Sequence, residues 1–579
     1  MGARLVWGPH LAHHRGAPLV KKAKKIVKKT APKKAVHKAA KKAVVKKAVV
    51  KKKVVVKKKV LFKKVIPKKK TRVPAKKAVK TTKSVKTAAR TSKAKERTKA
   101  RAALAQRLVS APQVTQVEER KSIPKYPLVQ GADSERVRTL LPLLRDAVRK
   151  RTITDWRINL AHTRSANLYL GQDLTLEDDQ RAMREDIILT VYRRDADGRM
   201  GEAQVPIVKN DADSMRDAIT VAADLAQVAR KPTFSLPEPT EGITFPHGHD
   251  THMLESFLAG DGGKVPRAVL EEVRAQVALV RDVRLAAAEI LASAITVRVM
   301  NSRGIDVSFH RTALMVDLTF TSKGKADEQE FHWMVDVVSP DQLDLRTTIP
   351  REAQRARDAL AAIPSNGFTG GVLLSGEALR DYVVPSGGVG PLLLHAHARL
   401  KAMGVSRLAL GAPLGAFHGE PFTMSSNPAL PLGAFSMPVD EEGVALAPYD
   451  IVRTGTFTQW VAGPRYAAEM KVPLTGNVAN IHLSAGATRE EHLRGNAYLE
   501  VVSFSWFNPD LVSGDYSAEI RLGYVWHNGR ATPFRGGHLT GNVFKDFCDA
   551  RFSREVMQAG RYYGPRAVLL RNGTVTRST

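Results

Sequence analysis

Three histidines and an aspartate lie within six residues of one another, at His247, His249, Asp250 and His252. Imidazole and carboxylate groups are common zinc ligands, so the segment HGHDTH is a first candidate for a metal site. A working site also needs groups that hydrogen-bond to the ligands and orient them, and further ligands from other parts of the chain. The segment lies among prolines and glycines with no strand before it. This setting favours exposed loop histidines over metal ligands.

The same segment resembles the His-x-His-x-Asp-His pattern of metallo-hydrolases, but its aspartate comes one place early. A second histidine pair, His395 and His397, lies in LLLHAHARLKAMG, which we expect to form one helix. Side chains of residues that are two positions apart on a helix point to different faces. The pattern therefore favours two separate core or surface histidines over a pair of ligands.

Nucleophilic chemistry has weaker support. Ser425-Ser426 and Ser503/Ser505 lack the Gly-x-Ser-x-Gly turn that exposes a catalytic serine in α/β-hydrolases. Cys548, the only cysteine, lies in VFKDFCDARF, where we expect it to pack as a small apolar residue on a helix. A single cysteine also rules out an intrachain disulfide and a cysteine-rich zinc site. This is typical of a reducing cytoplasm.

The charge of the chain is confined to one segment. The 579 residues have a formal net charge of +36, yet residues 21–101 contain 36 lysines and arginines and one acid, Glu96. Residues 102–579 hold 54 basic and 55 acidic residues, so this part is almost neutral. With 43% hydrophobic residues it can bury more than one core, and its length predicts two or three domains. No apolar run reaches the length of a membrane span, and we expect no membrane association.

The basic segment consists of lysine pairs and triplets separated by alanine and valine. Like charges at this density repel one another and little apolar surface is available, so we expect the segment to be disordered alone. It resembles the Lys/Ala-rich tails of bacterial histone-H1-like proteins. Such a tail would associate with DNA or RNA by releasing counterions, with little sequence specificity. The densest lysines are the predicted contacts: Lys51, Lys52, Lys53, Lys57, Lys58, Lys59, Lys68, Lys69 and Lys70.

The near-neutral part mixes helical and strand patterns. Apolar residues at helical spacing predict helices at 134–151, 212–229, 266–282 and 346–363. Alternating residues predict a strand pair within 156–171, a hairpin turning at Asp197-Gly198, another turning at 301–304, and a strand at 331–339. After Gly404, short strands and glycine turns follow one another. We predict an α+β fold: an N-terminal α/β sheet-and-helix region, then a mostly antiparallel β C-terminal domain, preceded by the disordered Lys-rich tail.

Several short motifs occur in the order and spacing of one known family. They are DGRMGEA at 197–203, the Asn301-Ser302-Arg303-Gly304 turn, VDEEG at 439–443, a run ending in TGNV at 475–478, and SGDYSAEIRLGY at 513–524. Together they resemble the TldD/PmbA family, also described as modulators of DNA gyrase and as peptidase-U62-like proteins. The resemblance extends from about Asp133 to Arg571, and it is most specific at 367–384 and 439–529.

Catalytic members of that family carry His-Glu-x-x-x-His on a short helix, where two imidazoles bind a metal and the glutamate acts as a base. The glycine-bounded apolar run in GFTGGVLLSGEALRDYVV leads into the corresponding helix. Here Gly376 stands at the first histidine, Glu377 at the glutamate and Asp381 at the second histidine. No catalytic residue is therefore assigned. The chain most resembles the PmbA/TldE-type subunit, which lacks the metal motif.

The resemblance implies an assembly around a chamber, as a homodimer or with a metal-bearing TldD-type partner. Unfolded peptide substrates would be held there by backbone hydrogen bonds to a sheet edge. No cofactor is expected, and zinc would bind only on the partner or at an unrecognised site formed by His247, His249, His252, His395 or His397. We expect a cytoplasmic, nucleoid-associated protein. Two alternatives remain open: an active metallopeptidase with atypical ligands, and a nucleoid-associated binding protein.

The expected domain order combines the tail, a linker and three folded parts. It runs as an unassigned N-terminal extension (1–20), the Lys/Ala/Val-rich tail (21–110), a linker (111–131), an N-terminal α/β domain (132–240), a central domain (241–365) and a β-rich C-terminal domain (366–577).

Overall fold

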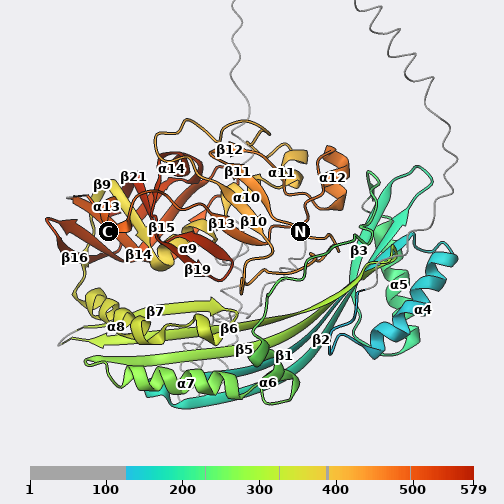
Figure 1. Ribbon diagram of the computed structural model, residues 1–579, viewed down its shortest axis with the longest axis horizontal. Coiled ribbons are helices and arrows are strands. Elements are labelled where there is room, and N and C mark those ends of the chain that lie inside the picture. Colours follow the sequence, from blue (N-terminus) through green and yellow to red (C-terminus); the bar gives the residue numbers. More distant parts are fainter. Residues whose placement is uncertain (1–125, 229, 325–326, 386–389, 496, 579) are drawn as a thin grey trace, which may run out of the picture. The chain divides into compact units, whose positions relative to one another are not determined.

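A computed structural model describes residues 126–228, 230–324, 327–385, 390–495 and 497–578 (Figure 1). These residues belong to one compact unit, so the predicted tail and its nine lysines lie outside the described part of the chain. The described residues form an α+β fold with a β-rich C-terminal region, which confirms the predicted fold class. No helix among the described residues is long and apolar enough to cross a membrane.

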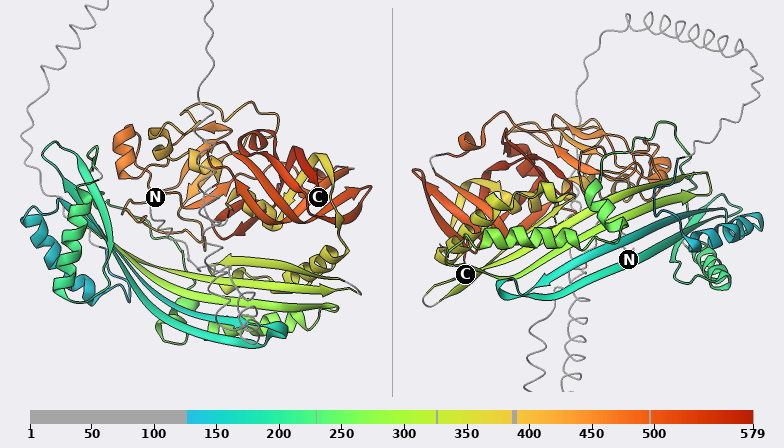
Figure 2. Two further views of the ribbon diagram at one scale, coloured as in Figure 1. Left: turned by 180° about the vertical axis from the view of Figure 1, so that it is seen from behind. Right: turned by 60° about the horizontal axis from the view of Figure 1, so that its bottom comes forward.

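The first half forms a seven-stranded sheet of unusually long strands, which we call the long sheet. Its order is β4-β3-β2-β1-β5-β6-β7, and all its pairings are antiparallel. Figure 2 shows the central strands curving together from two further directions. The strands are β1 (Asp155–Leu170), β2 (Leu176–Arg194), β3 (Met200–Pro206), β4 (Arg230–Lys231), β5 (Val283–Asn301), β6 (Asp306–Lys323) and β7 (Glu328–Val337).

Period-two alternation assigns the two faces of this sheet. One face carries residues such as Leu168, Ile290 and Val316, and the helices pack on it. The opposite face carries Val299 and Phe309, which pack against turns of the C-terminal region. The helices are α4 (Glu135–Arg149), α5 (Ala212–Ala226), α6 (Thr251–Leu258), α7 (Lys264–Val277) and α8 (Leu345–Ala361).

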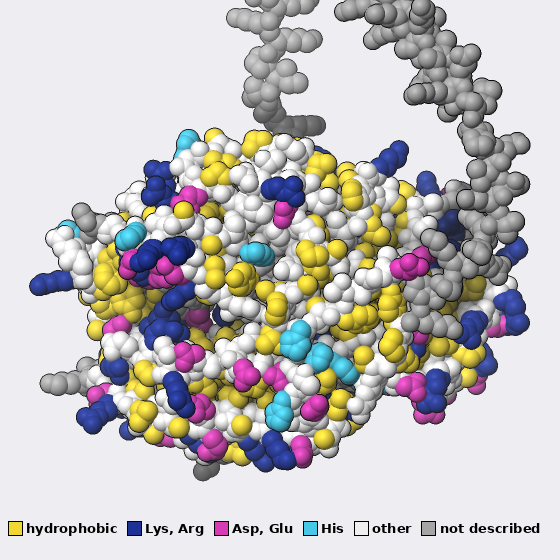
Figure 3. Space-filling view, viewed as in Figure 1, with side chains coloured by type: hydrophobic (Ala, Val, Ile, Leu, Met, Phe, Trp, Pro, Cys, Tyr) yellow, Lys and Arg dark blue, Asp and Glu magenta, His cyan; other side chains and the backbone are white. Residues whose placement is uncertain are grey.

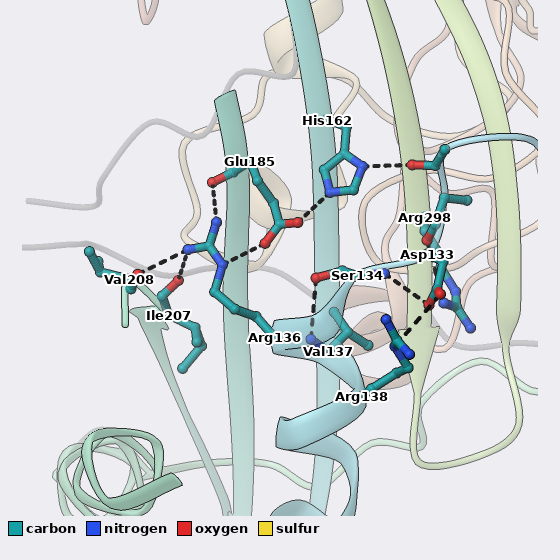
Figure 4. Close-up of polar contacts among 12 residues, drawn as sticks. Asp133, Ser134, Arg136, Val137, Arg138, His162, Glu185, Ile207, Val208 and Arg298 are labelled. Atoms are coloured by element: carbon teal, nitrogen blue, oxygen red, sulfur yellow. Dashed lines mark hydrogen bonds and ion pairs between the residues drawn. The ribbon is translucent and has the colours of Figure 1, made fainter. Parts of the chain in front are cut away.

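Helix α4 is tied to the long sheet by a charged network. Ser134 caps the helix by accepting a hydrogen bond from Val137 N. From its first turn, Arg136 donates to Glu185 on β2, and Glu185 also contacts His162 on β1 (Figure 4). Burial opposes ionisation, but hydrogen bonds from His162 and Arg136 bring the pKa of Glu185 below its ordinary value. The network is structural, because each group bonds within the fold.

The C-terminal region contains two further sheets. One has the order β14-β9-β21-β17-β15-β16-β8, with β18 on β21, and it closes on itself because β14 also pairs with β15. Its strands are β8 (Ile363–Pro364), β9 (Asn366–Ser375), β14 (Ala497–Pro509), β15 (Asp515–His527), β16 (Arg530–Arg535), β17 (His538–Asn542), β18 (Arg551–Phe552) and β21 (Ala567–Arg577).

The other sheet has the order β12-β11-β10-β13-β20-β19. Its strands are β10 (Met424–Asn427), β11 (Tyr449–Arg453), β12 (Thr456–Phe457), β13 (Asn480–Leu483), β19 (Val556–Ala559) and β20 (Tyr562–Pro565). Short helices connect the two sheets, and all of them except α13 contribute residues to the shared apolar core. They are α9 (Gly376–Val383), α10 (Pro391–His395), α11 (Ala398–Ala402), α12 (Pro464–Met470), α13 (Glu490–Leu493) and α14 (Val543–Asp549), and 3-10 turns occur at Gln172–Leu174 and Pro340–Gln342.

Two local predictions are wrong. Residues 156–171 form one strand instead of a pair, because both neighbours, β2 and β5, pair along nearly its whole length. The helix expected across His395 and His397 is broken into α10 and α11, and His397 instead forms a bridge with Val461. The turns at Asp197-Gly198 and 301–304 are confirmed, and Gly198 and Gly304 have the positive φ values that such turns favour.

Candidate functional site

The short helix α9 presents the aligned metal-motif positions on one face. Ala378, Leu379, Tyr382 and Val383 are buried in the core. The other residues of the helix, Gly376, Glu377, Arg380 and Asp381, are only partly buried. The 3.6-residue period of the helix therefore separates a packed face from a face that is available for chemistry.

The exposed side of α9 borders a cleft of about 580 Å³ between the long sheet and the C-terminal region, which we call the arginine cleft. Basic and acidic side chains gather at this seam in the space-filling view (Figure 3). Charged residues make up almost half of its lining, and apolar residues about a third. The charged residues are Asp344, Arg351, Glu352, Arg355, Glu377, Arg380, Glu490, Arg494, Glu500 and Arg566.

Glu377, at the position of the family's catalytic glutamate, is engaged in structural contacts. Its Oε1 accepts a hydrogen bond from the backbone N of Met334 on β7 at 3.1 Å, and its Oε2 accepts one from Ser503 Oγ at 3.2 Å. Arg380 binds the same β7 residue, donating to the carbonyl oxygen of Met334 at 3.0 Å. Two side chains of α9 thus satisfy the outward backbone groups of an edge strand.

A guanidinium group lies beside Gly376, where the family's first histidine would stand. A Cβ built on Gly376 would lie 3.5 Å from Nη2 of Arg355, and the backbone φ of +58° is one that other residues adopt with strain. Arg355 is held by Glu352, which is fully buried and accepts hydrogen bonds from Arg355 Nη1 at 3.0 Å and Arg351 Nε at 2.8 Å. A fixed cation therefore occupies the neighbourhood of the missing imidazole.

Asp381 stands at the position of the family's second histidine. Burial raises the pKa of this carboxyl group to about 6, although Arg380 lowers it. The residues present do not fit a zinc ion of the family's type, because glycine has no ligand atom, Glu377 is committed to β7 and a guanidinium repels a cation. No group of three or more His, Cys, Asp or Glu within the described residues is arranged to hold a metal ion.

The segment at 247–252 forms a loop and the start of α6. Asp250 caps the helix through Met253 N and accepts a hydrogen bond from Ser339 Oγ. The ring centroids of His247 and His249 are 5.8 Å apart, while His252 is exposed on α6.

His310 on β6, which the sequence motif did not include, lies with its ring centroid 5.8 Å from that of His249. Burial, His249 and Arg164 lower the pKa of His310 to about 4. The histidines are thus brought together in part, through a tilted contact of His247 with His249 and an edge-to-face contact of His249 with His310.

The other predicted histidines are separate. His395 is fully buried, donates from Nε2 to the carbonyl oxygen of Val512 and accepts from Arg407 N at Nδ1, and burial lowers its pKa. Burial, together with Arg561 and Arg399, lowers the pKa of His397 to about 4. Cys548 is buried on α14, and burial raises the pKa of its thiol to about 11, as expected for a packing residue.

The family-like turns 439–443 and 475–477 meet in a second polar cluster, the Asp440 turn. Oδ1 of Asp440 accepts hydrogen bonds from Glu442 N and Val444 N at 2.9 Å, and Oδ2 accepts one from Asn477 N at 3.0 Å. Burial and the neighbouring Glu441 and Glu442 raise the pKa of Asp440 well above its usual range.

The same turn docks on the long sheet. Asn159 donates to the carbonyl oxygen of Glu441 at 2.8 Å, and Arg157 lies 3.6 Å from Glu442.

Sequence reasoning found α9 but missed the residues that define the cleft. Arg351, Glu352 and Arg355 are charged residues on a helix, which are ordinarily solvent-exposed, and nothing local indicates that they meet α9. The signal present was their spacing, since Arg351 and Arg355 lie four residues apart on one helix face.

A protein-family model and several known proteins match this chain over part of its length. Residues 393–577 match the model of the PmbA/TldA metallopeptidase C-terminal domain. An uncharacterised protein of Methanocaldococcus jannaschii is 23% identical over 288 residues, which cover 47% of this chain and 65% of that protein, so the chain spans about two thirds of this curated relative's length.

Three solved structures share the fold at 14–16% identity. A proposed modulator of a DNA gyrase from Thermotoga maritima has a TM-score of 0.62, and 76% of this chain aligns with all of it. TldE from Thermococcus kodakarensis has a TM-score of 0.60, and 75% of this chain aligns with all of it. A proposed modulator of DNA gyrase from Bacteroides thetaiotaomicron has a TM-score of 0.64, and 77% of this chain aligns with 99% of that protein.

Proposed function

We propose that this chain, which the domain match and the shared fold assign to the TldD/PmbA family, is the non-metal subunit of a cytoplasmic peptide-processing complex. The complex would be completed by a metal-bearing partner of the same family or by a second copy of this chain. The observation that carries the proposal is the environment of α9: Gly376 and Asp381 replace two imidazoles, Glu377 binds β7, and Arg355 lies beside Gly376.

The first test is whether a metal site can be rebuilt. We expect purified chain to contain far less than one zinc per protomer by elemental analysis, and Gly376→His/Asp381→His to gain none, because Arg355 remains beside the site. Adding Arg355→Gln to the double variant should permit weak zinc uptake. Stoichiometric zinc in the unmodified chain would reject the non-metal assignment.

The partner proposal has its own test. A family member from the same source that carries His-Glu-x-x-x-His would be co-expressed with this chain, and size-exclusion chromatography and cleavage of an unfolded peptide would be measured. We expect a complex whose cleavage rate exceeds that of the metal-bearing protein alone. Equal rates with and without this chain would contradict a subunit role.

The basic segment suggests an accessory function, association with DNA or RNA. Its charge density supports this proposal, because each phosphate neutralised by a lysine releases a counterion. The full chain should bind a short DNA duplex with affinity that falls about 10³-fold or more between 50 and 200 mM salt. Deleting residues 1–110 should abolish this binding. If salt-sensitive binding survived the deletion, the tail would not be its source.

A further inference from the structure

The arginine cleft is balanced in charge but not in hydrogen-bonding capacity. It is lined by five arginines and five carboxylates. Each guanidinium has five N–H donors and no acceptor, whereas each carboxylate only accepts. The cleft can therefore hold excess donors even though its formal charges cancel.

The carboxylates are largely used by the protein itself. Glu352 binds two arginines, and Glu377 binds Met334 and Ser503. Both oxygens of Glu500 are also engaged, with Ser375 Oγ donating to one at 2.9 Å and Trp526 Nε1 to the other at 3.0 Å. These acids serve to position the fold.

The arginines are used less. Arg494 donates one hydrogen bond, to Glu490 at 2.9 Å, and Arg380 donates one, to the Met334 carbonyl. Arg355 uses only Nη1, on Glu352. Arg566 lies 3.7 Å from Glu490 as an ion pair without a side-chain hydrogen bond among the described residues. Arg494 and Arg380 also form longer ion pairs, at 3.7 Å from Glu500 and 3.8 Å from Glu377. Even so, most donor positions on these four cleft-lining side chains have no hydrogen-bond acceptor among the described residues.

Apolar residues complete the lining and narrow the choice of ligand. Trp333 and Leu345 are buried at the cleft wall, and Leu343, Val335 and Met557 are partly exposed there. The volume of about 580 Å³ is typical of a ligand pocket. A site with donors, apolar walls and nearby carboxylates suits a single negative charge on an apolar molecule, since a dianion would be repelled by the acids.

We propose that the arginine cleft binds the C-terminal carboxylate of a peptide whose last residue is apolar. The proposal rests on the proposed peptide-holding role and specifies which end of the peptide this subunit takes. Guanidinium groups bind carboxylates through paired N–H···O bonds, which are stronger and more directional than neutral hydrogen bonds. Arg355, beside Gly376, and the arginines of the opposite wall supply the donors, while the apolar wall contacts the terminal side chain.

The test compares two forms of one peptide on the full chain at 0.15 M salt. An N-terminally labelled Ala-Ala-Leu peptide with a free carboxylate and its C-terminal amide would be titrated by fluorescence anisotropy. We expect amidation to weaken binding by tenfold or more. Equal affinities would overturn the proposal, and so would inorganic phosphate that displaces the peptide at concentrations equal to the peptide's Kd.

Matched arginine variants separate the cleft from the basic tail. Arg566→Gln removes a cleft donor whose side chain is 56% exposed, so the fold should tolerate it, and we expect about tenfold weaker binding of the acid with little change for the amide. Arg346→Gln, on α8 but outside the cleft lining and 82% exposed, is the control and should bind as the unmodified chain does. Equal effects of the two variants would overturn the cleft assignment.

The outcome is distinguishable from failure of the proposed function. If acid and amide bind equally while the metal-bearing partner is still stimulated, only the carboxylate proposal fails. If neither form binds and no partner is stimulated, the peptide-processing role fails with it.

Discussion

The Asp440 turn and the arginine cleft both place carboxylates between the long sheet and the C-terminal region, but they satisfy them differently. Asp440 is buried and accepts three backbone N–H groups. Glu352 is equally buried but accepts from two arginine side chains at a cleft. A backbone N–H group has a single hydrogen, so no donor remains once it binds the carboxylate. A guanidinium group that binds a carboxylate still has further N–H donors available. The first arrangement stabilises the fold, and the second can also bind a ligand.

The strongest test of this contrast is Asp440→Ala. The substitution leaves three backbone N–H groups buried without their acceptor, and each such group costs about 1–3 kcal/mol. We expect the free energy of unfolding to fall by about 3–5 kcal/mol in urea titration. Asp440→Asn, which keeps one acceptor oxygen, should lose less than half of this. If Asp440→Ala unfolded with the midpoint of the unmodified chain, the turn would not be a stabilising element.

Two glycines sharpen the comparison because both have positive φ. A Cβ on Gly476 would meet Asp440 Oδ2 and Leu446 Cδ2, both at 2.8 Å. A Cβ on Gly376 would meet nothing closer than Val502 O at 3.3 Å. Gly376→Ala should therefore cost about 1–2 kcal/mol, from its left-handed backbone alone. Gly476→Ala adds a clash and should cost about 3 kcal/mol or more. Similar losses in thermal unfolding would remove the distinction between a closed and an open site.

The distinction also shows why part of the site escaped sequence analysis. The step from β9 into α9 was predicted, because an apolar run bounded by glycine precedes an amphipathic helix. The roles of Glu352 and Arg355 were not, since a helical pattern fixes which residues share a face but not which element approaches that face. Likewise, alternation in 156–171 indicated extended chain, but only pairing with β2 and β5 shows a single long strand.

Two features of the histidine segments could not be predicted from the sequence, for a related reason. The spacing of His247, His249 and His252 is local, whereas the edge-to-face contact of His249 with His310 depends on β6, some sixty residues further along the chain. The helix is interrupted between α10 and α11, where His397 forms a bridge with Val461. The helical pattern of LLLHAHARLKAMG does not indicate this bridge. Contacts between distant segments decided both cases.

A pH titration tests the charge balance of the Asp440 turn. Burial raises the pKa of Glu442 to about 7, although Arg157 lowers it and Glu441 raises it further. A carboxyl group whose pKa is higher in the folded state favours folding below its unfolded pKa of about 4.5, and this contribution is lost as the pH rises through 7. The loss should be on the order of 1–3 kcal/mol. Glu442→Gln should flatten the dependence of the unfolding free energy on pH between 4.5 and 7, and an unchanged slope would contradict this assignment.

The smallest expected effect, that of Glu377→Gln, bears most directly on function. Glutamine keeps one oxygen for the Met334 N–H, and its amide can donate to Ser503 Oγ, so stability should fall by about 1 kcal/mol or less. A catalytic base would lose its proton-accepting group in the same change, and peptide cleavage would fall by at least about 10². We expect cleavage by the complex with its metal-bearing partner to be unchanged. Because Glu377 Oε1 is already bound to the β7 backbone, a large loss of rate with intact folding would mean that this glutamate leaves β7 during turnover.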